Sequence, residues 1–389
     1  MRITVVGGGV IGLLTAIECV RASRTATGAE RVERVDLVDA ARIPSPSATS
    51  NDRLRVVRAL HRGNPALTLA AAGVHAGWMD VESVVGAHFY HPAGALTAMP
   101  AEELPAELAL LIETGAKAWA LSPEDLAAWY PRIRFPGGAG AVLEATAGAV
   151  LADHALVALA RWLGRNPVVR LHPHRPAVEV TESGGAAVLR FGNGTTLTAD
   201  RLVLAAGPWS RELVPADVGA DLTLYRQSVL SYRPAASLQE WTGVPAVLGL
   251  GPARDAWLMP AVPHSDAPVR LSAASACRPV AELTDRVTPD RWREHLVEVF
   301  SHLLDGFDPS AVTEATDGYY LAESHHGGPL LATYGAGTIW AYAACGGMSF
   351  KFAPLIARAI ADHALGRPPR PTGLPSIDRP RQLAAVGEE

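Results

Sequence analysis

The chain begins with MRITVVGGGVIG, residues 1–12, and this stretch decides its fold. The apolar residues before the glycines are typical of a short strand, and residues 13–22 are typical of a helix. Gly7, Gly9 and Gly12 have the G-x-G-x-x-G spacing, which lets the backbone turn tightly, approach a pyrophosphate and pack the helix against the strand. The N-terminus of such a helix faces the anion. The stretch therefore predicts a strand, turn and helix that bind a dinucleotide.

A second apolar run, residues 35–39, ends in Asp39. A carboxylate at the tip of the second strand can accept a hydrogen bond from a ribose hydroxyl of the dinucleotide. The polar stretch of residues 24–34 makes the connection from helix to strand longer than usual. The alternative interpretation of Asp39 is a solvated carboxylate at the end of a strand.

The composition describes an ordered globular protein. The 389 residues can bury a large core and are expected to form two domains or one two-lobed unit. The net charge is −5 and the basic residues are scattered, so no basic face exists for nucleic acid, which we exclude as a partner. The three cysteines form no C-x-x-C pair, which indicates a reducing compartment and no structural metal.

The sequence shows no membrane or export signal. It contains no apolar run long enough to span a bilayer. The apolar N-terminus lacks a basic segment before it and a small-residue cleavage site after it. We therefore expect a soluble, cytoplasmic protein with no membrane partner.

The rest of the chain alternates between segments that suit a nucleotide-binding lobe and stretches with a more strand-and-turn character. Asp153 is placed to cap a helix over residues 154–163, and a strand from residue 201 ends at Gly207, where backbone can again approach the cofactor. Other short strands suit a small antiparallel sheet, namely residues 168–171, 177–180, 187–191 and 195–198. A second antiparallel sheet is expected from residues 225–232, 246–250, 256–260 and 269–273.

The C-terminal third adds further elements. An amphipathic helix is predicted over residues 290–304, a strand over 338–343 and a last helix over 353–365. The proline-rich tail from Arg367 onward is expected to be a strap or disordered.

Four motifs, in order along the chain, resemble one known family. They are the glycine turn with Asp39, the run Arg55-Val56-Val57-Arg58, the triplet Tyr225-Arg226-Gln227, and Phe350-Lys351-Phe352 before the last helix. Together they resemble the FAD-dependent D-amino acid oxidase superfamily, and within it the monomeric sarcosine oxidase branch. The similarity is spread over nearly the whole chain.

The resemblance implies an α/β fold with bound FAD. A discontinuous Rossmann-like FAD-binding domain is expected from residues 1–85, 145–215 and 320–375. A substrate domain is expected from residues 86–144 and 216–319, with an antiparallel sheet that roofs the isoalloxazine ring, and residues 376–389 form a tail. Beside the three glycines and Asp39, the residues expected to contact the cofactor are Val178, Gly207, Gly347, Met348 and Lys351.

Two cations stand out in apolar surroundings. Arg58 lies in a strand-like run and Lys351 lies between two phenylalanines, so both should be partly desolvated. A buried cation is costly unless an anion meets it, which predicts a carboxylate substrate or internal acidic partners. In the family that the chain resembles, the matching residues hold the substrate carboxylate. The alternatives are a structural partner for Arg58 and a Lys351 side chain that extends to water.

The resemblance assigns three further site residues. Arg55 matches an arginine near the flavin, although an ordinary salt bridge is an alternative. Arg270 stands where the family places a lysine that promotes reaction with dioxygen. Tyr319 is expected to point into the cavity, with packing as the alternative.

The chain also departs from the family. Asp317 occupies the position of the cysteine that attaches the flavin, and a carboxylate cannot form that thioether. We therefore expect noncovalent FAD, with Cys345 as a remote alternative attachment point. The family's roof histidine is missing near Ala274, so sarcosine itself is not the expected substrate.

These observations predict an enzyme that oxidises a C–N bond in a secondary amine or amino acid bearing a carboxylate. The product would be an imine, and oxygen would accept the electrons and give hydrogen peroxide. One alternative is a flavin dehydrogenase of a 2-hydroxy acid. The other is a flavin-binding scaffold without catalysis.

Overall fold

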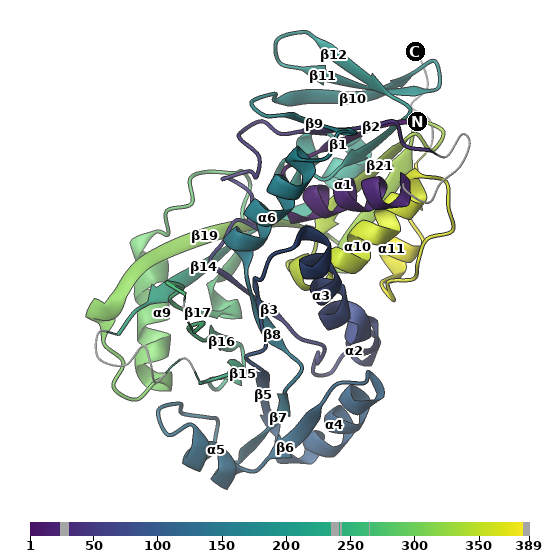
Figure 1. Cartoon of the computed structure of the whole chain (residues 1–389). Helices are drawn as coiled ribbons and strands as arrows, with labels where there is room; N and C mark the ends of the chain where they lie inside the picture. The colour runs from purple at the N-terminus through teal and green to yellow at the C-terminus, as the bar shows by residue number, and fades with distance from the viewer. Residues whose placement is uncertain (24–30, 235–240, 242, 264, 384–389) are drawn as a thin grey trace.

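Two large sheets organise the chain in the computed structural model (Figure 1). The structure describes residues 1–23, 31–234, 241, 243–263 and 265–383. Residues 24–30 of the expected polar connection lie outside the described residues, as do residues 384–389 of the tail.

The first sheet has seven strands in the order β22-β20-β21-β13-β1-β2-β9. β1 pairs in parallel with β2 on one side and with β13 on the other, and β21 and β9 extend the parallel region. The central strands β1, β2 and β13 are almost entirely buried because both of their faces are covered. The bounds of the strands in this sheet are β1 Arg2–Val6, β2 Arg34–Val38, β9 Val169–His172, β13 Arg201–Leu204, β20 Pro329–Tyr334, β21 Ile339–Cys345 and β22 Arg381–Gln382.

Helices cover one face of this sheet. α1 packs against α10 and α6, and α10 packs against α3, around one large apolar core. β1 and α1 confirm the strand and helix predicted on either side of the glycines. The helices of the structure are α1 Val10–Ser23, α2 Pro65–Ala70, α3 Val74–Val85, α4 Leu104–Glu113, α5 Pro123–Trp129, α6 Ala152–Gly164, α7 Ala216–Ala220, α9 Asp290–Leu303, α10 Ser349–Ala364 and α11 Pro375–Asp378.

The second sheet has nine strands and lies beside the first (Figure 1). Its pairings are antiparallel except for β15 with β5, and the long strands β14 and β19 pair along most of their length. The predicted strands over residues 246–250 and 269–273 are confirmed. Its strands are β5 Ala95–Pro100, β6 Ala118–Leu121, β7 Ala139–Glu144, β14 Leu222–Tyr232, β15 Ala246–Leu250, β16 Ala256–Met259, β17 Val269–Ala273, β18 Cys277–Pro279 and β19 Val312–Glu323.

Two three-stranded sheets complete the fold. One consists of β10 Ala177–Ser183, β11 Ala186–Phe191 and β12 Thr196–Ala199, and it lies at the top of Figure 1. The other consists of β3 Leu54–Val57, β8 Gly148–Leu151 and β4 Tyr90–His91.

Three sequence expectations were wrong in detail. Residues 169–172 do not join the small antiparallel sheet; they form β9, because α6 returns the chain parallel to β2. α6 begins at Ala152 with Leu151 as its N-cap, so Asp153 lies in the first turn instead of capping. α10 begins at Ser349, so Lys351 and its flanking phenylalanines lie in the first turn and not before the helix.

The C-terminal segment is ordered as far as it is described. α11 packs against α10 and β20, and β22 pairs in parallel with β20. On the basis of these sheets we propose the expected division, with residues 1–85, 145–215 and 320–375 around the first sheet and residues 86–144 and 216–319 around the second. β19 crosses from one part to the other.

Candidate functional site

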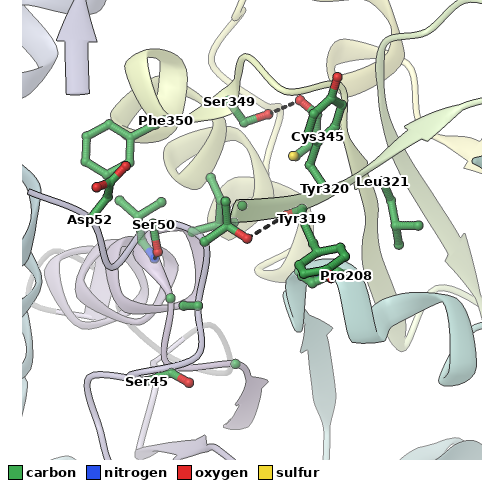
Figure 2. A pocket seen from close by; sticks show the side chains of 18 of the residues that line it. Ser45, Ser50, Asp52, Pro208, Tyr319, Tyr320, Leu321, Cys345, Ser349 and Phe350 are labelled. Carbon is green, nitrogen blue, oxygen red and sulfur yellow. Dashed lines mark hydrogen bonds between the residues drawn. The ribbon is translucent and has the colours of Figure 1, made fainter. Parts of the chain in front are cut away.

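A cavity of about 1050 Å³ runs between the two large sheets. It extends from the glycine turn after β1, past the loop of residues 45–50, to the inner faces of β14, β16 and β17. Figure 2 shows Ser50 and Asp52 on one side of this pocket and Tyr320 and Cys345 on the other. The volume is ample for a dinucleotide and a small substrate together.

The glycine turn has the shape that a pyrophosphate requires. Gly7 has φ +118°, and a Cβ added there would lie 2.2 Å from the carbonyl oxygen of Ala205. A Cβ on Gly12 would lie 1.9 Å from the carbonyl oxygen of Gly7, so α1 can pack this closely only with glycine. Gly9 faces the cavity with no contact tighter than 3.3 Å for an added Cβ. The residues present therefore fit a dinucleotide whose phosphates meet the N-terminus of α1.

Asp39 lies at the tip of β2 and is buried. Its carboxylate accepts hydrogen bonds from the backbone N–H groups of Gly8 and Ala41, each at 2.7 Å. Asp39 therefore helps to shape the glycine turn and is not the solvated carboxylate of the alternative interpretation. Each of its oxygens keeps a second lone pair, which can accept a ribose hydroxyl.

The other residues expected at the cofactor also line the cavity. Val178 is an exposed residue of β10, Gly207 follows β13 with φ +59°, and Met348 precedes α10. Gly347 has φ +69°, and an added Cβ would lie 3.0 Å from the ring of Tyr320. A larger residue at position 347 would therefore collide with the ring of Tyr320.

Arg58 and Lys351 line the same cavity although they are far apart in the sequence. Arg58 follows β3, and burial lowers its pKa to about 10. Burial lowers the pKa of Lys351 well below its usual value, and the charge of Arg58 adds to this effect. Within the described residues neither side chain forms an ion pair with a carboxylate, so both alternatives, a structural acid and an exit to water, lack support.

The partner of Lys351 is His61. Nζ of Lys351 lies 2.9 Å from Nε2 of His61, and Nδ1 of the same ring lies 2.7 Å from the carbonyl oxygen of Ala59. Because only an N–H can bond a carbonyl, Nδ1 carries the proton and Nε2 accepts from Lys351. Burial lowers the pKa of His61 to about 2, helped by the charges of Lys351 and Arg58.

Glu144 at the end of β7 is the acidic group that faces these two cations. Its carboxylate accepts from the backbone N–H groups of Ala59 and Leu60 at 2.9–3.1 Å. Nε2 of His75 lies 2.7 Å from the same group. Glu144 thus holds the backbone of the Arg58 segment in place and has little capacity left for the cations themselves.

A second charged cluster surrounds Asp52. Its carboxylate lies 3.0 Å from Arg270 and 3.2 Å from Arg55. Burial raises the pKa of Asp52, but the charges of Arg55, Arg270 and Arg286 outweigh it and leave the pKa below its usual value. The salt-bridge alternative for Arg55 is therefore present in the structure, and Arg55 also lines the cavity.

Arg270 is almost fully buried on β17. One guanidinium nitrogen donates to Ser231 at 2.5 Å and the other to Thr316 at 3.2 Å. Its Nε has no hydrogen-bond partner within the part of the chain that the structure describes. Two arginines, Arg55 and Arg270, share the carboxylate of Asp52, so this part of the cavity wall has an excess of positive charge.

Asp317 is completely buried on β19. Its carboxylate accepts from Nε of Arg226, from Arg278 at 2.9 Å and from the hydroxyl of Thr288 at 2.7 Å. The carboxylate thus neutralises two arginines of the neighbouring strands β14 and β18. Asp317 therefore has a structural role in joining these strands.

Tyr319 lines the cavity, but its hydroxyl points elsewhere. It bonds Thr284 at 2.8 Å and the carbonyl oxygen of Asp285 at 3.0 Å. Its ring is buried in the core beneath β13 and β21. The backbone carbonyl of Tyr319 accepts a hydrogen bond from the hydroxyl of Thr49 at 2.5 Å. The packing alternative therefore describes Tyr319 better than a role in chemistry.

Sequence reasoning missed His61, Glu144 and Asp52. A signal existed for Glu144, because it is the one charged residue in the apolar run Ala139–Glu144. His61 follows Arg58 by three residues, but nothing in the sequence places it against Lys351. No group of three or more metal-binding side chains occurs among the described residues, and none of the described helices is long and apolar enough to cross a membrane.

Comparisons with known proteins identify the family to which the chain is similar. The family described as FAD dependent oxidoreductase (DAO) matches residues 2–363. The peroxisomal sarcosine oxidase of Mus musculus is 25% identical over 259 residues, which cover 63% of this chain and 61% of that protein. The chain thus matches less than two thirds of the length of that curated relative.

Solved structures share the fold over nearly the whole chain. NikD, an unusual amino acid oxidase essential for nikkomycin biosynthesis, superposes in its open form with a TM-score of 0.78 at 19% identity, covering 97% of each chain. The fructosyl amine:oxygen oxidoreductase of Aspergillus fumigatus has a TM-score of 0.71 at 16% identity, covering 98% of this chain and 93% of that one. Glycine oxidase of Bacillus cereus has a TM-score of 0.70 at 15% identity, covering 94% and 95%.

Proposed function

The chain belongs to the family of FAD-dependent oxidoreductases, and we propose that it oxidises a C–N bond in an amino acid or secondary amine that carries a carboxylate. One observation carries this proposal: Arg58 and Lys351 converge on the cavity, and no carboxylate pairs with either of them in the described part of the chain. Arg58 and Lys351 can carry two positive charges against the one negative charge of Glu144, which forms an ion pair with neither, and this favours an anionic ligand.

The two cations offer complementary contacts to a carboxylate. Arg58 presents a planar fork that can bind both oxygens, and Lys351 presents a compact group that can approach from the side. Fixing the carboxylate at two points would orient the neighbouring carbon and nitrogen toward the flavin. When bound, FAD supplies the two-electron oxidant: the hydrogen on that carbon leaves with its electron pair, the nitrogen loses a proton, and an imine forms.

The space around this clamp suits a substrate with an apolar body. Val229 and Leu248 on the roof sheet and Trp257 and Met259 on β16 line the cavity, together with Phe350 of α10. We therefore propose a substrate larger than sarcosine.

A substrate panel separates this proposal from its rivals. Under anaerobic conditions, amino acids and secondary amines with a carboxylate should bleach the yellow absorbance of the flavin, because they reduce it. Bleaching by 2-hydroxy acids alone would support the dehydrogenase of hydroxy acids. If no compound of either class bleaches the flavin, the protein is a binding scaffold.

We expect the FAD to be held without a covalent bond. Asp317 cannot form a thioether, and Cys345 is the cysteine that lines the cavity within the described residues. Burial raises the pKa of the Cys345 thiol, which leaves little reactive thiolate. After precipitation of the protein with acid, the yellow colour should remain in the supernatant. Colour in the pellet of the wild type that disappears in Cys345→Ser would contradict this expectation.

We propose dioxygen as the electron acceptor, with Arg270 as the residue that promotes its reduction. Oxygen gains negative charge as it accepts electrons, and a buried cation stabilises that charge. Replacing Arg270→Met should slow reoxidation of the reduced flavin roughly tenfold, equivalent to about 1.4 kcal/mol. Stopped-flow mixing with oxygenated buffer gives this rate.

The matched variant for Arg270 is Asp52→Asn. It removes the carboxylate that partly neutralises Arg270 and Arg55, so reoxidation should become faster than in the wild type. Equal rates in the wild type and Arg270→Met would show that this arginine has no part in the reaction with oxygen.

A further inference from the structure

We infer that Lys351 is the base that takes the proton from the substrate's ammonium group, and that it stays uncharged until a carboxylate binds because its partner His61 brings no negative charge. This inference rests on the proposed oxidation of an amino acid or carboxylate-bearing amine. It addresses a step that the oxidation requires, because an ammonium nitrogen has no electron pair with which to form an imine.

No contact of Lys351 among the described residues brings a negative charge that would hold it as an ammonium in the empty cavity. Its hydrogen-bond partner is Nε2 of His61, which offers a lone pair and no negative charge. The carbonyl oxygen of Ala59 fixes this tautomer, since it accepts the proton on Nδ1. An uncharged Nζ that donates one N–H to His61 still has a lone pair, and Lys351 lines the cavity.

The charges around Lys351 lead to the same conclusion. The titratable groups that face it are Arg58, His61 and Glu144, with His75 and Tyr90 behind Glu144. Glu144 is the acidic one among them, and it already accepts two backbone N–H groups. One buried carboxylate and one buried guanidinium balance, so a second buried cation would be uncompensated.

The lowered pKa of Lys351 also agrees with an uncharged amine in the empty cavity. Burial is the main cause that lowers the pKa of Lys351, and Arg58 lowers it further against the opposing effect of Glu144. His61 cannot take the proton in place of Lys351, because its own pKa is lowered to about 2.

A substrate carboxylate changes this balance. It brings one negative charge beside Lys351 and so favours the charged form of the lysine. The ammonium nitrogen of an amino acid is one carbon away from that carboxylate and lies within reach of Nζ. One N–H bond of the ammonium breaks, its electron pair stays on the substrate nitrogen, and the proton forms a new N–H bond on Nζ of Lys351. The substrate amine is then neutral, and Arg58 and Lys351 together hold its carboxylate.

His61 is a positioning residue in this scheme. A carboxylate at position 61 would pair with Lys351 and hold it as an ammonium in the free enzyme. Lys351 would then have no lone pair, and its charge would already be neutralised before the substrate arrived. A neutral acceptor at position 61 is therefore required by the chemistry and not only by packing.

Proton uptake measures the charge state of Lys351 directly. The flavin-loaded protein is titrated with cyclohexanecarboxylate, which has no amine, in two buffers of different ionisation enthalpy at about pH 8. A calorimeter then reports the protons taken from the buffer for each carboxylate bound. We expect close to one proton per site, because the ligand cannot supply the proton that Lys351 requires.

Variants assign this proton to Lys351. His61→Asp should take up no proton and bind cyclohexanecarboxylate at least tenfold more weakly, because its lysine is already charged and paired. His61→Asn keeps a neutral acceptor and should retain the uptake. Lys351→Met should bind weakly without uptake.

The inference is overturned if the wild type binds the carboxylate without taking up a proton, or if Lys351→Met takes up as much as the wild type. This result is independent of the substrate panel. A flavin that is bleached by amino acids while the proton count is zero would leave the proposed oxidation intact and remove Lys351 as its base.

Discussion

Replacing Arg58→Met should lower kcat/KM for a carboxylate-bearing amine by more than a hundredfold. Truncation of one partner in a buried, hydrogen-bonded charge pair costs about 2–5 kcal/mol, and about 1.4 kcal/mol corresponds to a factor of ten. Arg58 forms no ion pair among the described residues, and Glu144 would keep its hydrogen bonds to the backbone and to His75, so removal of Arg58 should leave the fold intact. Steady-state kinetics with the best substrate of the panel measure the effect.

The matched control is Arg62→Met, four residues further along the same segment. Arg62 pairs with Glu103 at the surface, 2.5 Å away, and an exposed pair contributes only about 0–1 kcal/mol. This variant should keep the wild-type kcat/KM. A second comparison uses an amine without a carboxylate, on which Arg58→Met and the wild type should differ little. An equal loss on both substrates would mean that Arg58 supports the structure of the cavity and does not bind the carboxylate.

Substitutions in the glycine turn should abolish flavin binding by two different routes. In Gly12→Ala the new Cβ would lie 1.9 Å from the carbonyl oxygen of Gly7, so α1 must move away from β1. Such overpacking costs about 1–3 kcal/mol and displaces the helix N-terminus that faces the phosphates. We expect a colourless protein with a lowered melting temperature.

Gly9→Ala should separate binding from folding. Its Cβ would meet only the hydroxyl of Ser50 at 3.3 Å and the Cβ of Ala48 at 3.5 Å, so the protein without flavin should melt as the wild type does. The added methyl group would occupy the backbone surface that a pyrophosphate approaches, and the affinity for FAD should fall roughly a hundredfold. A thermal melt of the flavin-free protein measures the first effect. The ratio of flavin to protein absorbance and a fluorescence titration with FAD measure the second.

Gly137→Ala is the control for both glycine variants. An added Cβ at Gly137 has no neighbour within 4 Å, and its φ is not positive. It should bind FAD and melt as the wild type does. Full flavin occupancy in Gly9→Ala would show that the pyrophosphate does not lie against this turn.

Local patterns predicted the strand and the helix on either side of the glycine turn well. The G-x-G-x-x-G spacing needs only a strand before it and a helix after it, and these interactions lie within a few residues of one another. The same holds for the short strands 246–250 and 269–273, which turns delimit on both sides. The start of α10 was predicted too late because Ser349, Phe350 and Lys351 pack in its first turn against α3 and β21.

Charged contacts between distant segments could not be predicted in this way. Asp317 was recognised as a departure from the family, but its two arginine partners became apparent only when β14, β18 and β19 paired. Likewise Asp52 meets Arg270 only because the loop before β3 reaches the roof sheet.

The amino-acid sequence by itself determined the fold class, the glycine turn for the dinucleotide, and the two cations, Arg58 and Lys351, in apolar surroundings. The glycine turn and the two cations follow from residue types at short spacing, and the fold class follows from the resemblance of four motifs to a known family. The tertiary structure alone decided which partner each cation has, because hydrogen bonds such as that from Lys351 to His61 join residues hundreds of positions apart. Their effect on charge depends on burial, which packing of the whole chain creates.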